Sequence, residues 1–305
     1  MEISQVRLRM VNIYRNWFLA SRPWSFSMSA ISVSVGAALA GMDGPFSWPL
    51  YLYTLLTMTV LHAATNLLND HYDVLSGVDD KKVSTAQYRP HPLLEGKLSP
   101  NQVKIGAYLL YAIAIIAGIY LAALRGWTIL TIGIIGVLAS LTYTAPPFKY
   151  KYIGLGEFSV FLMWGPLMVE GSYFVQRQML GKSAFWVSLP FGALVALVLL
   201  VNNLRDMKND EENGIRTLPL LIGRLNGVRL YIALVIIAYL SILWMAFMGP
   251  LRLWSLIVLF SLPLAYRLLK QIGRNIPLDG DAQTAQLDTA FGVLLLTSLI
   301  LGGIF

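Results

Sequence analysis

The chain has 305 residues, of which 56% are hydrophobic and 13% charged, and its formal net charge is +7. A soluble domain of this length usually carries about 25% charged residues, so the composition excludes an ordinary soluble protein. The absence of cysteine excludes disulfide bonds and thiolate metal sites.

Long apolar segments follow one another along the chain, each close to the ~20 residues that cross a bilayer as a helix. Backbone groups in lipid must be satisfied within their own element, so we expect helices. The sequence predicts one all-α membrane domain, 1–305, with about nine transmembrane helices and an interfacial amphipathic helix at 1–21. The predicted spans are 22–42, 47–68, 102–124, 127–145, 155–176, 184–204, 228–248, 252–270 and 286–305.

Two of the predicted connections are long, 69–101 and 205–227, and both lie on the N-terminal side of the membrane. This side also carries 19 of the 23 Lys and Arg residues. Since positive loops stay in the cytoplasm, we expect a multi-pass protein of the cell inner (plasma) membrane with a cytoplasmic N-terminus. Topology and anion binding account for the positive charge, and a nucleic-acid partner is not expected.

The second and the sixth span each end in an acidic helix face. An Asn is followed by two Asp at spacings of about one turn, which places the three side chains on one face. The residues are Asn66, Asp70 and Asp73 in the first face and Asn202, Asp206 and Asp210 in the second. The two faces are 136 residues apart, so a bundle of two related halves would bring them opposite each other.

These faces predict a magnesium and diphosphate site. Carboxylates ~6 Å apart repel by about 3 kcal/mol per pair at an effective dielectric of 20, so the acids require cations. Their oxygens suit Mg²⁺, which binds through one or two carboxylates and substrate phosphates. Basic side chains on the same side are candidates to bind the phosphate oxygens. They are Arg22, Lys81, Arg89, Lys97 and Arg216.

Other polar residues near the spans have two readings. Tyr143 is either an interfacial aromatic anchor or a ring that flanks a cation. Glu157 is either a buried group paired with a Lys or an acceptor-binding residue. We expect His62 to be a hydrogen-bonded packing residue, and the ring of His71 to point away from Asp70 and Asp73.

The acidic motifs resemble those of the UbiA superfamily of intramembrane aromatic prenyltransferases, and within it the 1,4-dihydroxy-2-naphthoate prenyltransferases. Asn69-Asp70-x-x-Asp73 is similar to the first motif, and Asn202-Asn203-x-Arg205-Asp206-x-x-x-Asp210 to the second. The third acid of the first motif stands at Asp79, as in the naphthoate branch. Ile215 departs from that branch, which has Lys there.

The resemblance implies a UbiA-like bundle and a reaction. Two Mg²⁺ ions held by the four Asp residues clamp the diphosphate of an allylic polyprenyl donor, with Asn66 and Asn202 completing the shells. Ionisation gives a carbocation that Tyr143 could stabilise. The acceptor, bound by Asn69 and Glu157, is 1,4-dihydroxy-2-naphthoate, which loses its carboxylate as CO2. Membrane lipid surrounds the bundle.

Three alternatives remain at the sequence level. The acceptor of a UbiA-type enzyme could be 4-hydroxybenzoate or homogentisate. A secondary transporter also has many spans and buried acids, but here the acids lie at helix ends. A soluble-type prenyl diphosphate synthase would not need apolar spans, and a non-catalytic heterodimer partner would be expected to lose its Asp pairs.

Overall fold

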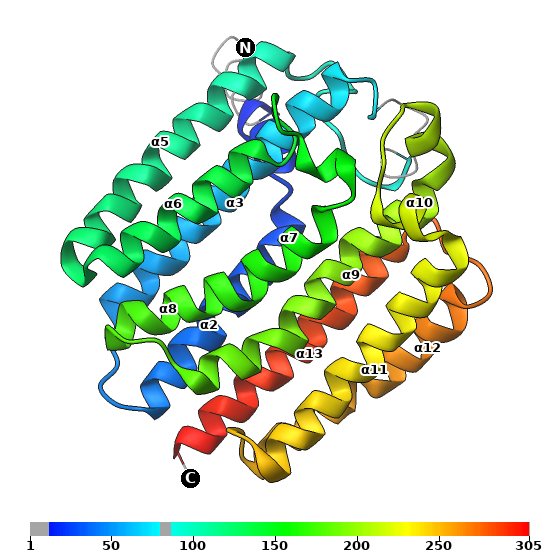
Figure 1. Ribbon diagram of the computed structural model, residues 1–305. Coiled ribbons are helices and arrows are strands. Elements are labelled where there is room, and N and C mark those ends of the chain that lie inside the picture. The colour runs from blue at the N-terminus through cyan, green and yellow to red at the C-terminus, as the bar shows by residue number, and fades with distance from the viewer. Residues whose placement is uncertain (1–11, 80–86, 305) are drawn as a thin grey trace, which may run out of the picture.

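The computed structural model describes residues 12–79 and 87–304, whose long helices run side by side in one bundle (Figure 1). No β-strand occurs among these residues, and the prediction of an all-α membrane fold is confirmed. The uninterrupted long helices are α2 (Phe26–Met42), α3 (Trp48–Leu75), α5 (Pro100–Arg125), α6 (Trp127–Thr142), α9 (Lys182–Glu212), α11 (Arg224–Met248) and α13 (Gly280–Ile304).

Two of the predicted spans are interrupted helices. The fifth consists of α7 (Gly156–Leu162), a π-helical turn (Met163–Leu167) and α8 (Met168–Arg177). Gly165 in this turn has non-helical backbone angles, and Pro166 follows it. Proline lacks an amide hydrogen and clashes with the preceding turn, which explains the interruption. The eighth span begins as a 3-10 helix (Leu253–Ser261) and continues as α12 (Leu262–Ile272).

Each of the nine predicted spans coincides with one of these helical segments of the described chain. Seven of these helical segments are long and apolar enough to cross a membrane, and α3 and α6 are the two that do not meet both conditions. Helix α6 has 16 residues, and α3 carries polar residues in its last turns. The count of nine spans is therefore approximate.

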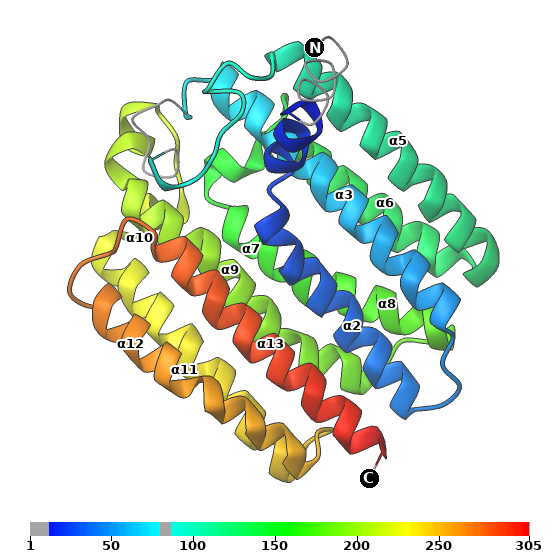
Figure 2. The same ribbon diagram turned by 180° about the vertical axis from the view of Figure 1, so that it is seen from behind.

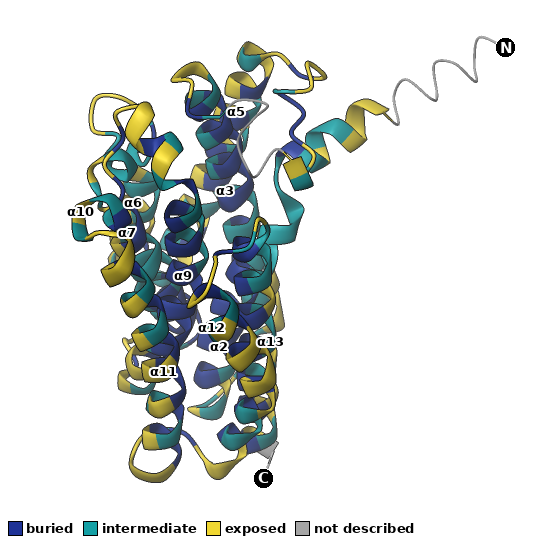
Figure 3. Cartoon of the chain, turned by 90° about the vertical axis from the view of Figure 1, so that its right-hand side faces the viewer, coloured by how far each residue is buried: buried dark blue, intermediate teal, exposed yellow. Residues whose placement is uncertain are grey.

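The outer surface of the bundle is apolar. Large hydrophobic side chains such as Ile116 and Phe260 are 68% and 80% exposed. Figure 3 shows buried residues inside the bundle and exposed ones around it. An apolar surface of this extent marks contact with a membrane, so the chain is a multi-pass membrane protein.

Helices α3 and α9 both continue beyond the predicted spans, so the acidic residues lie on helices rather than in loops. The predicted connections 69–101 and 205–227 therefore begin later, after Leu75 and Glu212. Backbone hydrogen bonding continues through polar residues once it has started, which the hydropathy pattern does not reveal. Gly77 and Gly214 follow the helix ends with φ of 76° and 70°, a left-handed conformation that commonly ends helices.

The largest apolar core lies among α2, α8, α9, α11 and α13. Figure 2 shows α13 between α2 on one side and α11 and α12 on the other. Helix α13 begins near the end of the bundle that carries the acidic motifs. This packing brings a C-terminal element to the site.

Candidate active site

The two acidic motifs meet at the head of a large cavity. Asn66, Asn69 and Asp73 from α3 line it together with Asn202 from α9. The cavity has a volume of about 560 Å³. A smaller recess of about 40 Å³ beside it is lined by residues of both motifs, including Asp206 and Asp210. The prediction that the two helix ends lie opposite each other is therefore confirmed.

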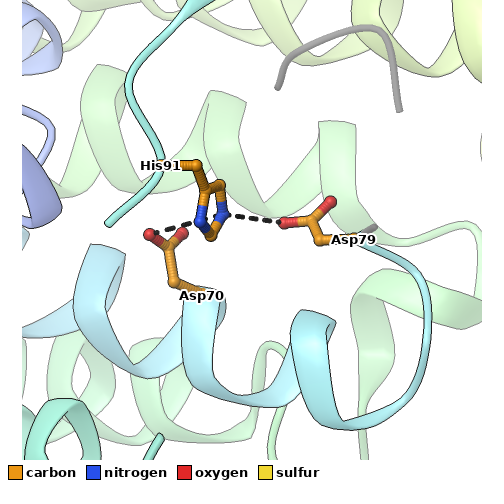
Figure 4. A group of neighbouring side chains, drawn as sticks. All are labelled: Asp70, Asp79 and His91. Atoms are coloured by element: carbon orange, nitrogen blue, oxygen red, sulfur yellow. Dashed lines mark ion pairs between the residues drawn. The ribbon is translucent and has the colours of Figure 1, made fainter. Parts of the chain in front are cut away.

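Asp70 is buried in a cluster with Arg22, Asp79 and His91. Its carboxylate forms an ion pair with Arg22, which precedes the short 3-10 helix Pro23–Ser25. The His91 Nε2 atom lies 3.9 Å from Asp70 Oδ2 and 3.6 Å from Asp79 Oδ2. Figure 4 shows the imidazole between the two carboxylates. Two other chain segments, those of Arg22 and His91, thus converge on the first motif.

Neighbouring charges shift the pKa values of His91 and Asp79 in this cluster. Burial lowers the pKa of His91, but the Asp79 and Asp70 carboxylates outweigh it and hold the pKa above its ordinary value. Burial raises the pKa of Asp79, but His91, Arg22 and Lys151 outweigh it and keep the pKa below the ordinary value. Asp79 is therefore ionised at neutral pH, beside an imidazole that favours its charged form.

Asp73 is held by the segment that follows α6. Lys151 Nζ lies 2.8 Å from Asp73 Oδ2, and the Tyr152 hydroxyl donates to Asp73 Oδ1. Both residues belong to the 3-10 helix Tyr150–Ile153. Burial lowers the pKa of Lys151, but Asp73, Tyr152 and Asp79 raise it by more, so Lys151 is a permanent cation between the two motifs.

Arg205 organises the second motif. Its guanidinium contacts Asp206 through Nε at 3.0 Å and Nη2 at 2.7 Å, and Nη2 also donates to Asn202 Oδ1. Its Nη1 lies 3.0 Å from Asp281, in the first turn of α13. Asp281 also pairs with Arg89 at 3.1 Å and accepts a hydrogen bond from Tyr88. Asp281 therefore ties the segment after the first motif to α9.

The oxygen-rich donor set fits Mg²⁺, a hard cation that prefers carboxylates. The buried Oδ2 atom of Asp210 forms no hydrogen bond of ordinary geometry within the described ranges, although Thr217, Asp206 and Lys151 are neighbours of this carboxyl group. A carboxylate oxygen without such a partner in the recess beside the cavity is available to a cation. Ligand atoms of Asp70, Asp79 and His91 also lie within 4.8 Å of one another.

The chain matches the UbiA prenyltransferase family over residues 29–298. It belongs to that family. One relative is the 1,4-dihydroxy-2-naphthoate octaprenyltransferase of Bacillus subtilis, 28% identical over 92% of this chain and 91% of the relative. Another is the UbiA prenyltransferase domain-containing protein 1 of Dictyostelium discoideum, 32% identical over 90% of this chain and 84% of the relative.

Solved structures share the fold of this UbiA-family chain. The apo structure of a UbiA homolog from Aeropyrum pernix K1 has a TM-score of 0.70 at 16% identity, covering 91% of this chain and 98% of its own. A UbiA homolog from Archaeoglobus fulgidus bound to GPP and Mg²⁺ has a TM-score of 0.61 at 15% identity, covering 92% and 99%. These structures show the fold, and the family match over residues 29–298 confirms the resemblance to the UbiA superfamily that was stated from the motifs.

Several residues expected at the UbiA-type site lie in or beside the cavity. Tyr143 and Arg89 line it, and the Lys151 Nζ atom lies 6.0 Å from the centre of the Tyr143 ring. Asn69 lines it too, although its Oδ1 accepts a hydrogen bond from Thr144 at 2.9 Å. Asn66 Nδ2 donates to the Ser21 carbonyl oxygen at 2.9 Å and to Ser25 Oγ at 3.1 Å.

Other expected residues lie elsewhere. Glu157 is buried and accepts a hydrogen bond from Asn203 at 2.9 Å rather than pairing with a Lys. Lys97 pairs with Glu95 on the surface, away from the cavity lining. Arg216 is exposed, and Lys81 lies outside the described residues. The diphosphate-binding role of these cations stays a prediction.

The sequence reading gave no role to Lys151, Tyr152, His91 or Asp281. Nothing in local spacing distinguishes Lys151 from Lys149, because only the folded chain brings it to Asp73. A signal for Asp281 did exist: it is an acid at the motif-side end of a span, like the motif acids themselves. His71 behaves as predicted, because its Nδ1 atom contacts the Pro100 carbonyl oxygen at 2.9 Å instead of the acids.

Proposed function

We propose that this UbiA-family protein transfers a polyprenyl group from an allylic polyprenyl diphosphate to 1,4-dihydroxy-2-naphthoate. The reaction depends on Mg²⁺ and takes place at the cytoplasmic side of the cell membrane. The products are demethylmenaquinol, CO2 and diphosphate. The observation that carries the proposal is the convergence of two acidic motifs at the head of a cavity whose walls are mostly apolar.

The cavity has the polarity of a lipid diphosphate. Its head contains carboxylates, amides and the positively charged side chains of Arg22, Arg89 and Lys151. Its remaining walls come largely from apolar residues of α5, α6 and the fifth span, among them Ile119 and Leu167. A polyprenyl chain would lie along these walls while its charged end meets the motifs.

Asp70, Asp73, Asp206 and Asp210 would hold the Mg²⁺ ions, with the amide oxygens of Asn66 and Asn202 beside them. Bound Mg²⁺ supplies charge neutralisation where negative charge develops on the leaving diphosphate. Arg22, Lys151 and Arg205 add fixed positive charge at the same place. Preorganised charges of this kind stabilise a transition state without a reorganisation cost.

The chemistry balances without an external acid or base. The allylic C–O bond breaks, and its electron pair leaves with the diphosphate. The ring carbon that bears the carboxylate forms the new C–C bond, and the electron pair of its bond to CO2 restores aromaticity. Apolar walls would exclude water that would otherwise capture the carbocation. The Tyr143 ring, which lines the cavity, would stabilise this cation through a cation–π contact.

The choice of acceptor rests on relatives and motifs. The Bacillus subtilis relative and one from Escherichia coli, 29% identical over 95% of this chain, both carry the name 1,4-dihydroxy-2-naphthoate octaprenyltransferase. Asp79, the third acid of the first motif, contacts the Asp70 cluster, which supports a role for the branch-specific position. From the names of these relatives and from the position of Asp79, we infer that the acceptor is a naphthoate.

A product assay tests the proposal. Detergent-solubilised protein is incubated with a polyprenyl diphosphate, Mg²⁺ and one of three acceptors: 1,4-dihydroxy-2-naphthoate, 4-hydroxybenzoate or homogentisate. We expect prenylated, decarboxylated product from the naphthoate, with the highest kcat/KM of the three, and no product with excess EDTA. A tenfold preference for 4-hydroxybenzoate would refute the naphthoate acceptor, and no product from any acceptor would refute the transferase.

A further inference from the structure

A second polar cluster lies in the cavity wall below the acidic motifs. It consists of Ser25, Ser29, His62 and Trp164, here called the His62 cluster, and all four residues line the cavity. On α3, positions 62, 66 and 70 share one face, and eight residues of helix span about 12 Å. The cluster therefore lies about two turns below Asp70, in the part of the cavity whose walls are mostly apolar.

Hydrogen bonds on one side of the imidazole make its Nδ1 atom an acceptor. Trp164 Nε1 donates to Ser29 Oγ at 3.0 Å, and Ser29 Oγ lies 2.8 Å from His62 Nδ1. An indole nitrogen is only a donor, so Ser29 accepts from Trp164. The Ser29 hydroxyl hydrogen then has Nδ1 as its acceptor.

Hydrogen bonds on the other side make Nε2 a donor. Ser25 Oγ donates to the Arg22 carbonyl oxygen at 2.8 Å and accepts from Asn66 Nδ2 at 3.1 Å. Its single hydrogen is thus used, and toward His62 Nε2, 3.3 Å away, it can only accept. Both sides agree on a neutral imidazole with the hydrogen on Nε2.

The Nε2–H group is held in place but weakly bonded. Its distance to Ser25 exceeds the ordinary 2.7–3.2 Å range of N–H···O bonds, and Ser25 already accepts from Asn66. The Phe26 and Trp164 rings meet the imidazole edge-on, with centroids 5.6 and 5.0 Å away, which fixes the ring plane. A ligand oxygen in the cavity can therefore take over this donor at little cost.

We propose that His62 binds the aromatic acceptor by donating its Nε2–H group to a ring oxygen, either a hydroxyl or a carboxylate. This inference rests on the proposed function and names the acceptor subsite of the same cavity. With the diphosphate at the level of Asp70, the first carbon of the donor lies below it, between Asn66 and His62. An acceptor oxygen at His62 then places the acceptor ring beside that carbon. In these apolar walls an unpaired oxygen would be costly, so the donor selects for oxygenated rings.

Steady-state kinetics with both substrates varied provide the test. We expect His62→Leu to raise the KM for 1,4-dihydroxy-2-naphthoate about tenfold, the typical effect of losing one hydrogen bond to a charged or polar group. The KM for the polyprenyl diphosphate should stay within about twofold. His62→Gln, whose amide N–H can replace the Nε2–H group, should stay close to the wild type. Thr59→Val is the matched control, because Thr59 lies on α3 outside the cavity lining and bonds only its own helix.

A binding measurement separates this inference from the proposed function. Calorimetric titration with 1-hydroxy-2-naphthoate, without donor, should show about tenfold weaker binding to His62→Leu and near-normal binding to His62→Gln. If His62→Leu does not fold, Ser29→Ala takes its place; it removes the bond that fixes Nδ1 as the acceptor and should weaken binding while the fold remains. His62-dependent binding by a protein without transferase activity would support the subsite and refute the enzyme. Unchanged binding, or equal increases in both KM values, overturns the role of His62.

Discussion

Most of the motif acids have a basic partner in the folded chain. The ion pairs are Arg22 with Asp70, Lys151 with Asp73, and Arg205 with Asp206. Burying an ion pair is weakly stabilising at best, because desolvation offsets the attraction. A contribution to fold stability is therefore a poor explanation for three such ion pairs at one cavity. We expect them to keep the head of the cavity charged and ordered for a ligand that carries both metal ions and phosphate.

Removing the charge of Asp70 tests this at the residue scale. Asp70→Asn keeps the side-chain shape, removes a metal ligand and leaves Arg22 with only the longer 4.0 Å contact to Asp79. We expect kcat to fall by about 10²–10³-fold, the typical effect of losing one preorganised group, while thermal unfolding in detergent shows a folded protein. Asp206→Asn should behave alike because it occupies the corresponding position in the second motif.

Glu212→Gln is the matched control for these two variants. Glu212 lies on α9 two residues after Asp210, but its side chain is 66% exposed. It forms a long surface ion pair with Lys208, at 3.9 Å. The Glu212→Gln variant should therefore have the activity of the wild type. Near-normal Mg²⁺-dependent turnover by Asp70→Asn would contradict a metal-binding role for the first motif.

The sequence revealed the acids of the site and the cations Arg22 and Arg205, but not the other partners of these acids. Asp70 and Asp73, like Asp206 and Asp210, are grouped by helical spacing, which is a local property of the chain. Lys151 reaches the site only through tertiary packing, so local spacing could not predict it, whereas Asp281 had a signal in its place at the motif-side end of a span. Lys97 illustrates the converse: it lies on the expected side of the membrane, yet it pairs with Glu95 on the surface.

At the scale of elements, close contact between helices depends on glycine. A side chain at Gly36 in α2 would place its Cβ atom 2.1 Å from the Val169 carbonyl oxygen of α8. Small residues allow such close approach in membrane bundles. The hydropathy pattern predicted that both segments are helices, but it carried no information about which helices touch.

Gly36→Ala should therefore destabilise the protein. The clash is with backbone, which cannot rotate away, so α2 and α8 must separate, and overpacking of this kind typically costs about 1–3 kcal/mol. We expect a lower midpoint of thermal unfolding in detergent. Gly133→Ala is the control, because nothing lies within 4 Å of its added Cβ atom, and alanine favours the helix by up to about 1 kcal/mol. Equal midpoints for the two variants would show that the α2–α8 contact does not limit stability.

At the scale of the whole molecule, the bundle has two chemically distinct ends. The acidic motifs, the Asp70 cluster and the first turn of α13 gather at one end of the bundle, and the final residues of α13 lie at the other end (Figure 1). Apolar length predicted where helices cross the membrane, and charge predicted which ends share a side. The cavity itself was not predictable, because its walls combine at least five helical segments that are distant in sequence.

The distribution of positive charge gives these two ends an orientation that can be measured. The connection after α12 is on the motif side; it contains Arg274 and follows Arg267 and Lys270 of α12. The connection after α11 lies on the opposite side. Because Lys and Arg resist export, the motif end should face the cytoplasm. A phosphatase that is active only in the periplasm should therefore be active when fused after Gly249 and inactive when fused after Asn275. A β-galactosidase fusion, active only in the cytoplasm, should give the opposite pattern at the same two sites. Phosphatase activity after Asn275 alone would mean that the active site faces outward, and that the net charge of +7 serves ligand binding rather than topology.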